Sequence, residues 1–160
     1  MACLPRVRMN PGENSRICVL TPDEENAYLQ AALNLGRAAE KAYEQALKGI
    51  RVTLRNEQPI KPDSNLLHDV ATVLLDFGLR PDECYRLKWE QIRDDAIEIH
   101  NRKGAGSRRR VPCSPRVLSI LEVRRAYITS EWVFPRDTKS GHIEVFTLLD
   151  QHYAAVTMLL

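Results

Sequence analysis

The chain has 160 residues and a formal net charge of +2 at pH 7, with 44% apolar and 28% charged residues. These values allow one ordinary buried core and show no bias toward a disordered, collagen-like or membrane protein. No apolar run reaches the roughly 18 residues of a membrane-spanning helix, and the first residues carry neither the apolar stretch nor the cleavage site of a signal peptide. We therefore expect one globular domain in the cytoplasm, without a membrane partner.

A helix-start signal predicts that the first helix begins at Pro22. Thr21 can act as its N-cap, proline suits the first helical position, and Glu24 lies three residues after Thr21, as in a capping box. Residues 38–55 again have a helical composition, and the proline-rich segment 56–65 predicts a loop that ends this second stretch.

An apolar face at helical spacing predicts a core helix over residues 66–77, and Gly78 is suited to end it. Pro81 can open another helix, which we expect to continue to Ile92, although its apolar positions have a mixed period. The segment 78–80 therefore connects two predicted helices.

Two strands follow these helices. Alternating apolar and polar residues predict a strand from Ala96 to His100, and residues 108–113 can pair with it. The intervening segment KGAGS contains two glycines, which predicts a β-hairpin.

Helices again dominate the last part of the chain. Pro115 opens a helix that runs to Tyr127, with the stem of Arg124 directed inward. Residues 132–135 predict a short buried segment, and residues 140–160 predict a final helix that ends in an apolar pattern, which indicates that the domain continues beyond it. The expected fold class is α+β, mainly helical, with a small antiparallel β-sheet.

Basic residues are concentrated in one segment. Residues 1–99 hold 13 Lys and Arg against 16 Asp and Glu, whereas residues 100–125 hold 8 basic residues and the single acidic residue Glu122. Such a segment within a nearly neutral protein is typical of contact with a polyanion, and a solvated surface is the alternative interpretation.

The four cysteines form no motif. Cys3, Cys18, Cys84 and Cys113 lie far apart, without a CxxC pair or a histidine at ligand spacing. They therefore predict neither a metal site nor a redox site, and we interpret them as reduced thiols with packing roles.

Two motifs in this order resemble the catalytic domain of the tyrosine recombinases, the phage-type integrases. The first is GLRPDECYRLKW at residues 78–89, and the second is the predicted hairpin RKGAGSRRRVP at residues 102–112, followed by SPRVLSIL. In the family these parts read GLR-P-x-E-x-x-x-L-x-W and K-(loop)-RR-x-(V/I)P-L-(S/T)P. The resemblance extends from Val19 to the end. It implies a site-specific recombinase that cleaves and rejoins DNA through a phosphotyrosine intermediate.

The resemblance assigns roles to three residues and implies no metal or other cofactor. Arg80 matches the first catalytic arginine, which stabilises the negatively charged phosphorane; a guanidinium suits this task because it stays charged and can hold two oxygens. Lys103 matches the hairpin lysine that protonates the leaving 5′-oxygen. Glu83 matches the acid that supports the arginine by a charge-assisted hydrogen bond, although a carboxylate at a helix start is equally explained by the helix dipole.

Double-stranded DNA is the partner that the resemblance implies. The candidates for DNA contact are Arg102 before the hairpin loop and Arg108, Arg109 and Arg110 after it. Because adjacent strand residues point to opposite sides, we expect the last three to divide between phosphate contact and packing on the strand face. The full-length recombinases of the family, from bacteria or phages, form homo-oligomers on DNA in the cytoplasm.

Other parts of the family pattern are not found in these 160 residues. In the family a His-x-x-Arg segment with the second arginine, a later His or Trp, and the tyrosine nucleophile follow the hairpin. Here His152 is followed by Tyr-Ala-Ala, and Tyr153 lies in the wrong place, so we interpret both as residues of the final helix. We expect the chain to be inactive alone. Residues 1–18 resemble a linker from a core-binding domain, residues 19–160 a partial catalytic domain, and about 35–65 a helical insertion.

Two other interpretations remain open. One is a non-catalytic DNA-binding or regulatory module that reuses the fold, and the other is a protein-interaction fragment with an incidental basic hairpin. Lys103→Ala separates a recombinase from a module, because it would abolish cleavage in a longer, tyrosine-containing protein but would barely alter binding by a module. DNA affinity that does not fall with salt would favour the interaction fragment.

Overall fold

The computed structural model describes residues 20–49, 60–100, 108–144 and 148–158. Within these ranges the protein is mainly helical with one small antiparallel β-sheet, which confirms the expected α+β class. In chain order the elements are α1 (Pro22–Gly49), α2 (Leu66–Phe77), α3 (Pro81–Tyr85), the 3₁₀-helix η1 (Trp89–Gln91), β1 (Ile92–Arg93), β2 (Ala96–His100), β3 (Arg108–Pro112), α4 (Pro115–Tyr127) and α5 (Leu149–Thr157). None of the helices in these ranges has both the length and the apolar character that a membrane crossing requires.

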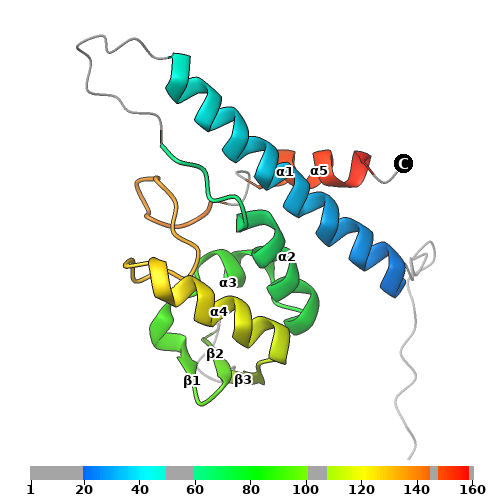
Figure 1. Cartoon of the computed structure of the whole chain (residues 1–160). Helices are drawn as coiled ribbons and strands as arrows, with labels where there is room; N and C mark the ends of the chain where they lie inside the picture. The colour runs from blue at the N-terminus through cyan, green and yellow to red at the C-terminus, as the bar shows by residue number, and fades with distance from the viewer. Residues whose placement is uncertain (1–19, 50–59, 101–107, 145–147, 159–160) are drawn as a thin grey trace, which may run out of the picture.

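Figure 1 shows the arrangement of these elements. The sheet lies at the bottom of the view, close to α3 and α4, and α1 runs along the opposite side of α2 with α5 against it. The sheet and α1 therefore lie on opposite sides of α2.

The long helix α1 begins where the capping box predicts. The N–H and hydroxyl groups of Thr21 both donate to Glu24 Oε2 at 2.8 Å, and the Glu24 N–H donates to Thr21 Oγ1 at 3.3 Å. The helix then continues unbroken to Gly49, so the prediction of two separate helical stretches is wrong. Gly36 lies in its interior, where a Cβ atom would collide with the carbonyl oxygen of Ser64. Glycine therefore lets α1 lie directly against the loop before α2.

The core helix α2 and the glycine that ends it agree with the prediction. Val70 and Val73 are buried on its inner face. Gly78 adopts a left-handed conformation with φ 56° and donates its N–H to the carbonyl of Leu74. Before this helix, residues 60–65 form a loop and a turn, which confirms the predicted loop for the described part of residues 56–65.

The helix that begins at Pro81 is much shorter than predicted, because the chain after it pairs with a distant segment. α3 ends at Tyr85 instead of continuing to Ile92. The carbonyl of Leu87 accepts the Val133 N–H at 2.9 Å, and Lys88 forms an antiparallel β-bridge with Trp132. These tertiary hydrogen bonds replace the helical ones, which accounts for the mixed apolar period of the sequence.

Three antiparallel strands in the order β1-β2-β3 form the sheet. β2 and β3 form the predicted hairpin, with Ile99 opposite Arg109, and the segment 101–107 between them lies outside the described residues. The two-residue strand β1 was not predicted. It joins β2 through a turn at Asp94 and Asp95, which have positive φ values of 46° and 56°.

The predictions for the last part of the chain hold for α4 and only in part for α5. α4 spans the predicted residues, and Val133 and Phe134 of the next segment are fully buried, as expected. The final helix is shorter than predicted. Residues 140–144 are not helical: Gly141 has a φ of 74°, and Pro135 and His142 form a β-bridge.

The main core fixes the elements that carry the predicted site residues. Its buried members include Leu66, Val70, Val73, Cys84, Leu87, Ile97, Ile99, Val117, Leu121, Val133, Phe134 and Ile143. Since Cys84 belongs to α3 and Ile99 to β2, burial of these side chains holds α3 and the hairpin to one common core. A smaller cluster of Ala31, Ala32, Leu67 and Ala155 joins α1, α2 and α5.

Candidate nucleic-acid interface

Arg80 lies on the short connection between α2 and α3. Gly78 ends α2, the side chain of Leu79 is buried, and Arg80 follows as the exposed N-cap residue of α3, with φ −68° and ψ 144°. Pro81 then occupies the first position of the helix, where its fixed φ is favourable. Within the described ranges, the guanidinium of Arg80 forms no ion pair. It is therefore available to an anion from solvent.

Glu83 connects the start of α3 with the hairpin. Its Oε2 accepts the main-chain N–H of Arg80 at 3.0 Å and the Nη2–H of Arg109 at 2.7 Å. Its side chain is only 14% exposed, and its Oε1 is buried without a hydrogen-bond partner among the residues described. One carboxylate oxygen thus contacts two predicted site residues.

Glu83 supports Arg80 through the main chain. Its carboxylate accepts the Arg80 N–H, which is a charge-assisted bond at the helix N-cap, and takes its charged partner from β3 and not from the Arg80 guanidinium. The cause is local: a glutamate at the third helical position reaches back to the N-cap N–H. α3 has only five residues, so the helix dipole at Arg80 is also smaller than the longer predicted helix would have given.

The arginines of β3 have different surroundings, as expected for adjacent strand residues. Arg109 contacts Glu83, whereas Arg110 Nη2 donates to Asp94 Oδ2 at 3.2 Å in the turn between β1 and β2. The side chains of Arg109 and Arg110 are 44% and 53% exposed. The main chain of Arg108 belongs to β3, but its side chain, like all of Arg102 and Lys103, lies outside the described part of the protein.

Two arginines of the basic segment belong to internal ion pairs. Arg116 at the start of α4 contacts Asp76 of α2 through Nε at 2.9 Å and Glu25 of α1 through Nη1 at 2.6 Å. The hydrogen bonds that Arg116 donates to Asp76, and then the one that it donates to Glu25, raise the pKa of Arg116 above its ordinary value. The ion pairs of Arg116 therefore connect α4 with α2 and with α1.

Arg124 is buried completely, which goes beyond the expectation that only its stem points inward. Its Nη1 donates to Asp69 and its Nη2 to Asp63, both at 2.6 Å, and its Nε donates to the carbonyl of Val133 at 3.1 Å. The guanidinium lies over the Phe134 ring, 4.7 Å from its centre. Burial acts to lower the pKa of Arg124, but the two carboxylates outweigh burial and raise it. The sequence offers no signal for these distant pairs.

His152 and Tyr153 lie on α5, as predicted. His152 Nδ1 lies 2.8 Å from the hydroxyl of Tyr28 in α1, and the two rings meet edge to face. Burial, and then the nearby Tyr85, raise the pKa of the Tyr28 hydroxyl. The histidine therefore helps to join α1 to α5.

The two cysteines within the described ranges, Cys84 and Cys113, are free thiols. Burial raises the pKa of both, most strongly that of Cys84, which makes each a poor nucleophile. In the same ranges no three His, Cys, Asp or Glu side chains gather as metal ligands would.

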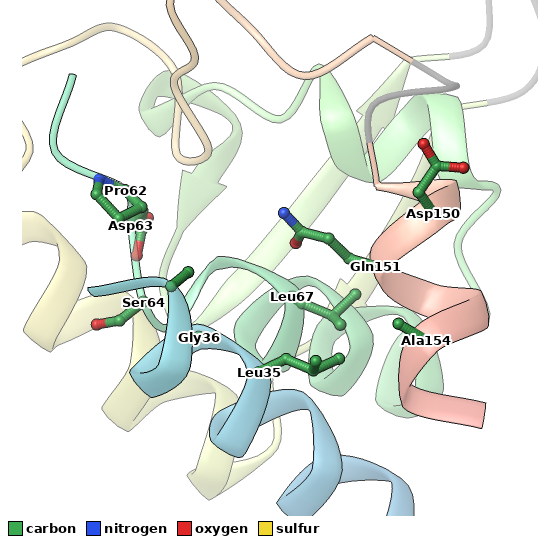
Figure 2. Close-up of a pocket in the computed structure, with 10 residues that line it drawn as sticks. Leu35, Gly36, Pro62, Asp63, Ser64, Leu67, Asp150, Gln151 and Ala154 are labelled. Atoms are coloured by element: carbon green, nitrogen blue, oxygen red, sulfur yellow. The ribbon is translucent and has the colours of Figure 1, made fainter. Parts of the chain in front are cut away.

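A cavity of about 310 Å³ lies between α1, the loop before α2, and α5. Figure 2 shows Leu35, Leu67 and Gln151 around it, with Asp150 at the start of α5. Its lining includes none of the predicted site residues, so it is separate from the α3–hairpin junction.

Compared with known protein families, curated proteins and solved structures, the chain matches none of them.

Proposed function

We propose that this chain is part of a site-specific DNA recombinase of the tyrosine type, and that Arg80 is its first catalytic arginine. The observation that carries the proposal is the junction of α3 with the hairpin. There Arg80 is exposed and forms no ion pair with the described residues, and Glu83 connects its main chain to β3. Glu83 of the GLRPDECYRLKW motif and Arg109 of the RKGAGSRRRVP motif contact each other at this junction.

The chemistry of these side chains suits phosphodiester cleavage. A guanidinium can donate two parallel hydrogen bonds to phosphate oxygens, and it stabilises the charge that develops on phosphorus. Lys103 would supply the proton that the leaving 5′-oxygen needs. No His-x-x-Arg follows the hairpin in these 160 residues, and Tyr153 lies on α5 beside His152, which contacts Tyr28. We therefore expect the chain to bind duplex DNA and not to cleave it.

Binding is tested by fluorescence anisotropy with a short labelled duplex at several salt concentrations. The affinity should fall with salt, and Arg80→Ala should weaken it about tenfold, with the slope against log salt reduced by about one. The matched control is Lys61→Gln, because Lys61 is also basic and pairs with Glu40 at 2.9 Å near the far end of α1. It should change affinity by less than about twofold. Equal effects of the two substitutions would contradict the assignment of Arg80.

Cleavage is tested with a nicked duplex that traps a tyrosine–DNA adduct. We expect denaturing gels to show no covalent complex with this chain. An adduct that disappears with Tyr153→Phe would overturn the interpretation of Tyr153 as an ordinary helix residue.

A further inference from the structure

The ion pair between Glu83 and Arg109 joins the two elements of the proposed site. Arg109 Nη2 donates to Glu83 Oε2 at 2.7 Å, and the same oxygen accepts the Arg80 N–H at 3.0 Å. Glu83 is mostly buried, and its second oxygen has no hydrogen-bond partner in the described ranges. Within these ranges, Arg109 is therefore the only cation that offsets the burial of this carboxylate.

We propose that Arg109 is a positioning residue, which fixes the main chain at Arg80 through Glu83; this inference rests on the proposed function of Arg80. A buried carboxylate that loses its cation is costly and turns toward water. The Arg80 N–H then loses its acceptor, and the connection that presents the Arg80 guanidinium is no longer held against β3. Arg109 thus acts on the phosphate site without occupying it.

The other role for Arg109 is direct contact with a DNA phosphate, as the sequence motif suggests. In that role Glu83 competes with DNA for the guanidinium. The two roles predict opposite effects of Glu83→Gln on DNA affinity: loss of a positioning carboxylate weakens binding, whereas loss of a competitor strengthens it.

The first measurement needs no DNA. In ¹⁵N–¹H correlation spectra, Arg109→Gln should shift the Arg80 amide signal, because this N–H donates to the carboxylate that Arg109 holds. Arg109→Lys should restore much of the wild-type shift, since it keeps the charge. The control Arg110→Gln, which loses the contact with Asp94, should leave the signal in place. An Arg80 signal that does not respond to Arg109→Gln would overturn the positioning role.

The second measurement compares DNA affinities in two backgrounds. Arg109→Gln should weaken binding about fivefold in the wild-type chain and less than about twofold in the Arg80→Ala chain, since coupled residues are not additive. Equal weakening in both backgrounds, or tighter binding with Glu83→Gln, would show that Arg109 contacts DNA directly. If Arg80→Ala has no effect while the amide signal responds as expected, the proposed function fails and the positioning contact stands. Circular dichroism checks folding, and the DNA affinity of Glu83→Gln still separates the two roles if Arg109→Gln unfolds.

Discussion

Replacing Arg124 by methionine removes a charged group from the centre of the fold and keeps most of the apolar volume of its side chain. Its guanidinium is fully buried and connects α4 to Asp63 before α2, to Asp69 within α2, and to the carbonyl of Val133. Methionine can still fill the space over Phe134, so the loss comes chiefly from the groups that Arg124 leaves behind.

The structure ranks those groups by burial. The side chain of Asp69 is 9% exposed and, among the described side chains, keeps only His68 Nδ1 at 2.9 Å. The side chain of Asp63 is 29% exposed and can turn to water. Breaking a buried pair costs about 3–5 kcal/mol, and an exposed pair contributes about 1 kcal/mol or less. We therefore expect Arg124→Met to lower the free energy of unfolding by about 4 kcal/mol, Asp69→Asn by about 3 kcal/mol, and Asp63→Asn by about 1 kcal/mol.

Urea unfolding followed by circular dichroism measures these differences. With a slope of about 2 kcal/mol per molar urea, Arg124→Met should move the midpoint by about 2 M. The paired variant Arg124→Met with Asp69→Leu should recover much of the loss, because it leaves no unpaired charge in the core. A cost below about 1 kcal/mol for Arg124→Met, or a larger effect for Asp63→Asn than for Asp69→Asn, would refute the reasoning.

The turn between β1 and β2 and the ion pair at the start of α4 give two further predictions. Asp95→Gly should raise the free energy of unfolding by up to about 1 kcal/mol, because glycine adopts the φ of 56° without strain, whereas Asp95→Ala should lower it; thermal unfolding distinguishes the two. The bonds from Arg116, together with that from Ser114, hold the pKa of Asp76 below its ordinary value of 3.8, although partial burial opposes them. Asp76 therefore contributes stability that is present above about pH 4 and is lost as the pH falls through its folded pKa. The free energies of unfolding of the wild-type chain and of Asp76→Asn, measured against pH, should converge below this folded pKa.

Local signals in the sequence predicted the element boundaries that depend on near neighbours. The capping box at Thr21, the left-handed glycine at Gly78 and the alternation of β2 each act within a few residues, and each is found where expected. α3 is different, because the main chain after it bonds to Val133, which lies 46 residues beyond Leu87. A helical pattern cannot reveal such a competing partner.

The candidate site shows the same division between local and distant information. The motif identified Arg80 and Glu83, and their short spacing explains the N-cap contact between them. The ion-pair partner of Glu83 is Arg109, which lies 26 residues away. The register of the hairpin determines that Arg109 faces α3. Only the fold can show which of three consecutive arginines meets the carboxylate.

The ion pairs within the protein also reduce the contribution that the basic segment can make to DNA affinity. A phosphate that binds Arg109 or Arg110 competes with a carboxylate of the protein, whereas Arg80 forms no ion pair with the residues that the structure describes. Arg116 and Arg124 remain committed to internal acids. Counterion release on binding should therefore be smaller than the number of basic residues suggests. Among the motif arginines with described side chains, Arg86, Arg109 and Arg110 each pair with a carboxylate, so Arg80 gains a phosphate at the least cost in lost contacts. This favours Arg80 as the first of them to meet DNA.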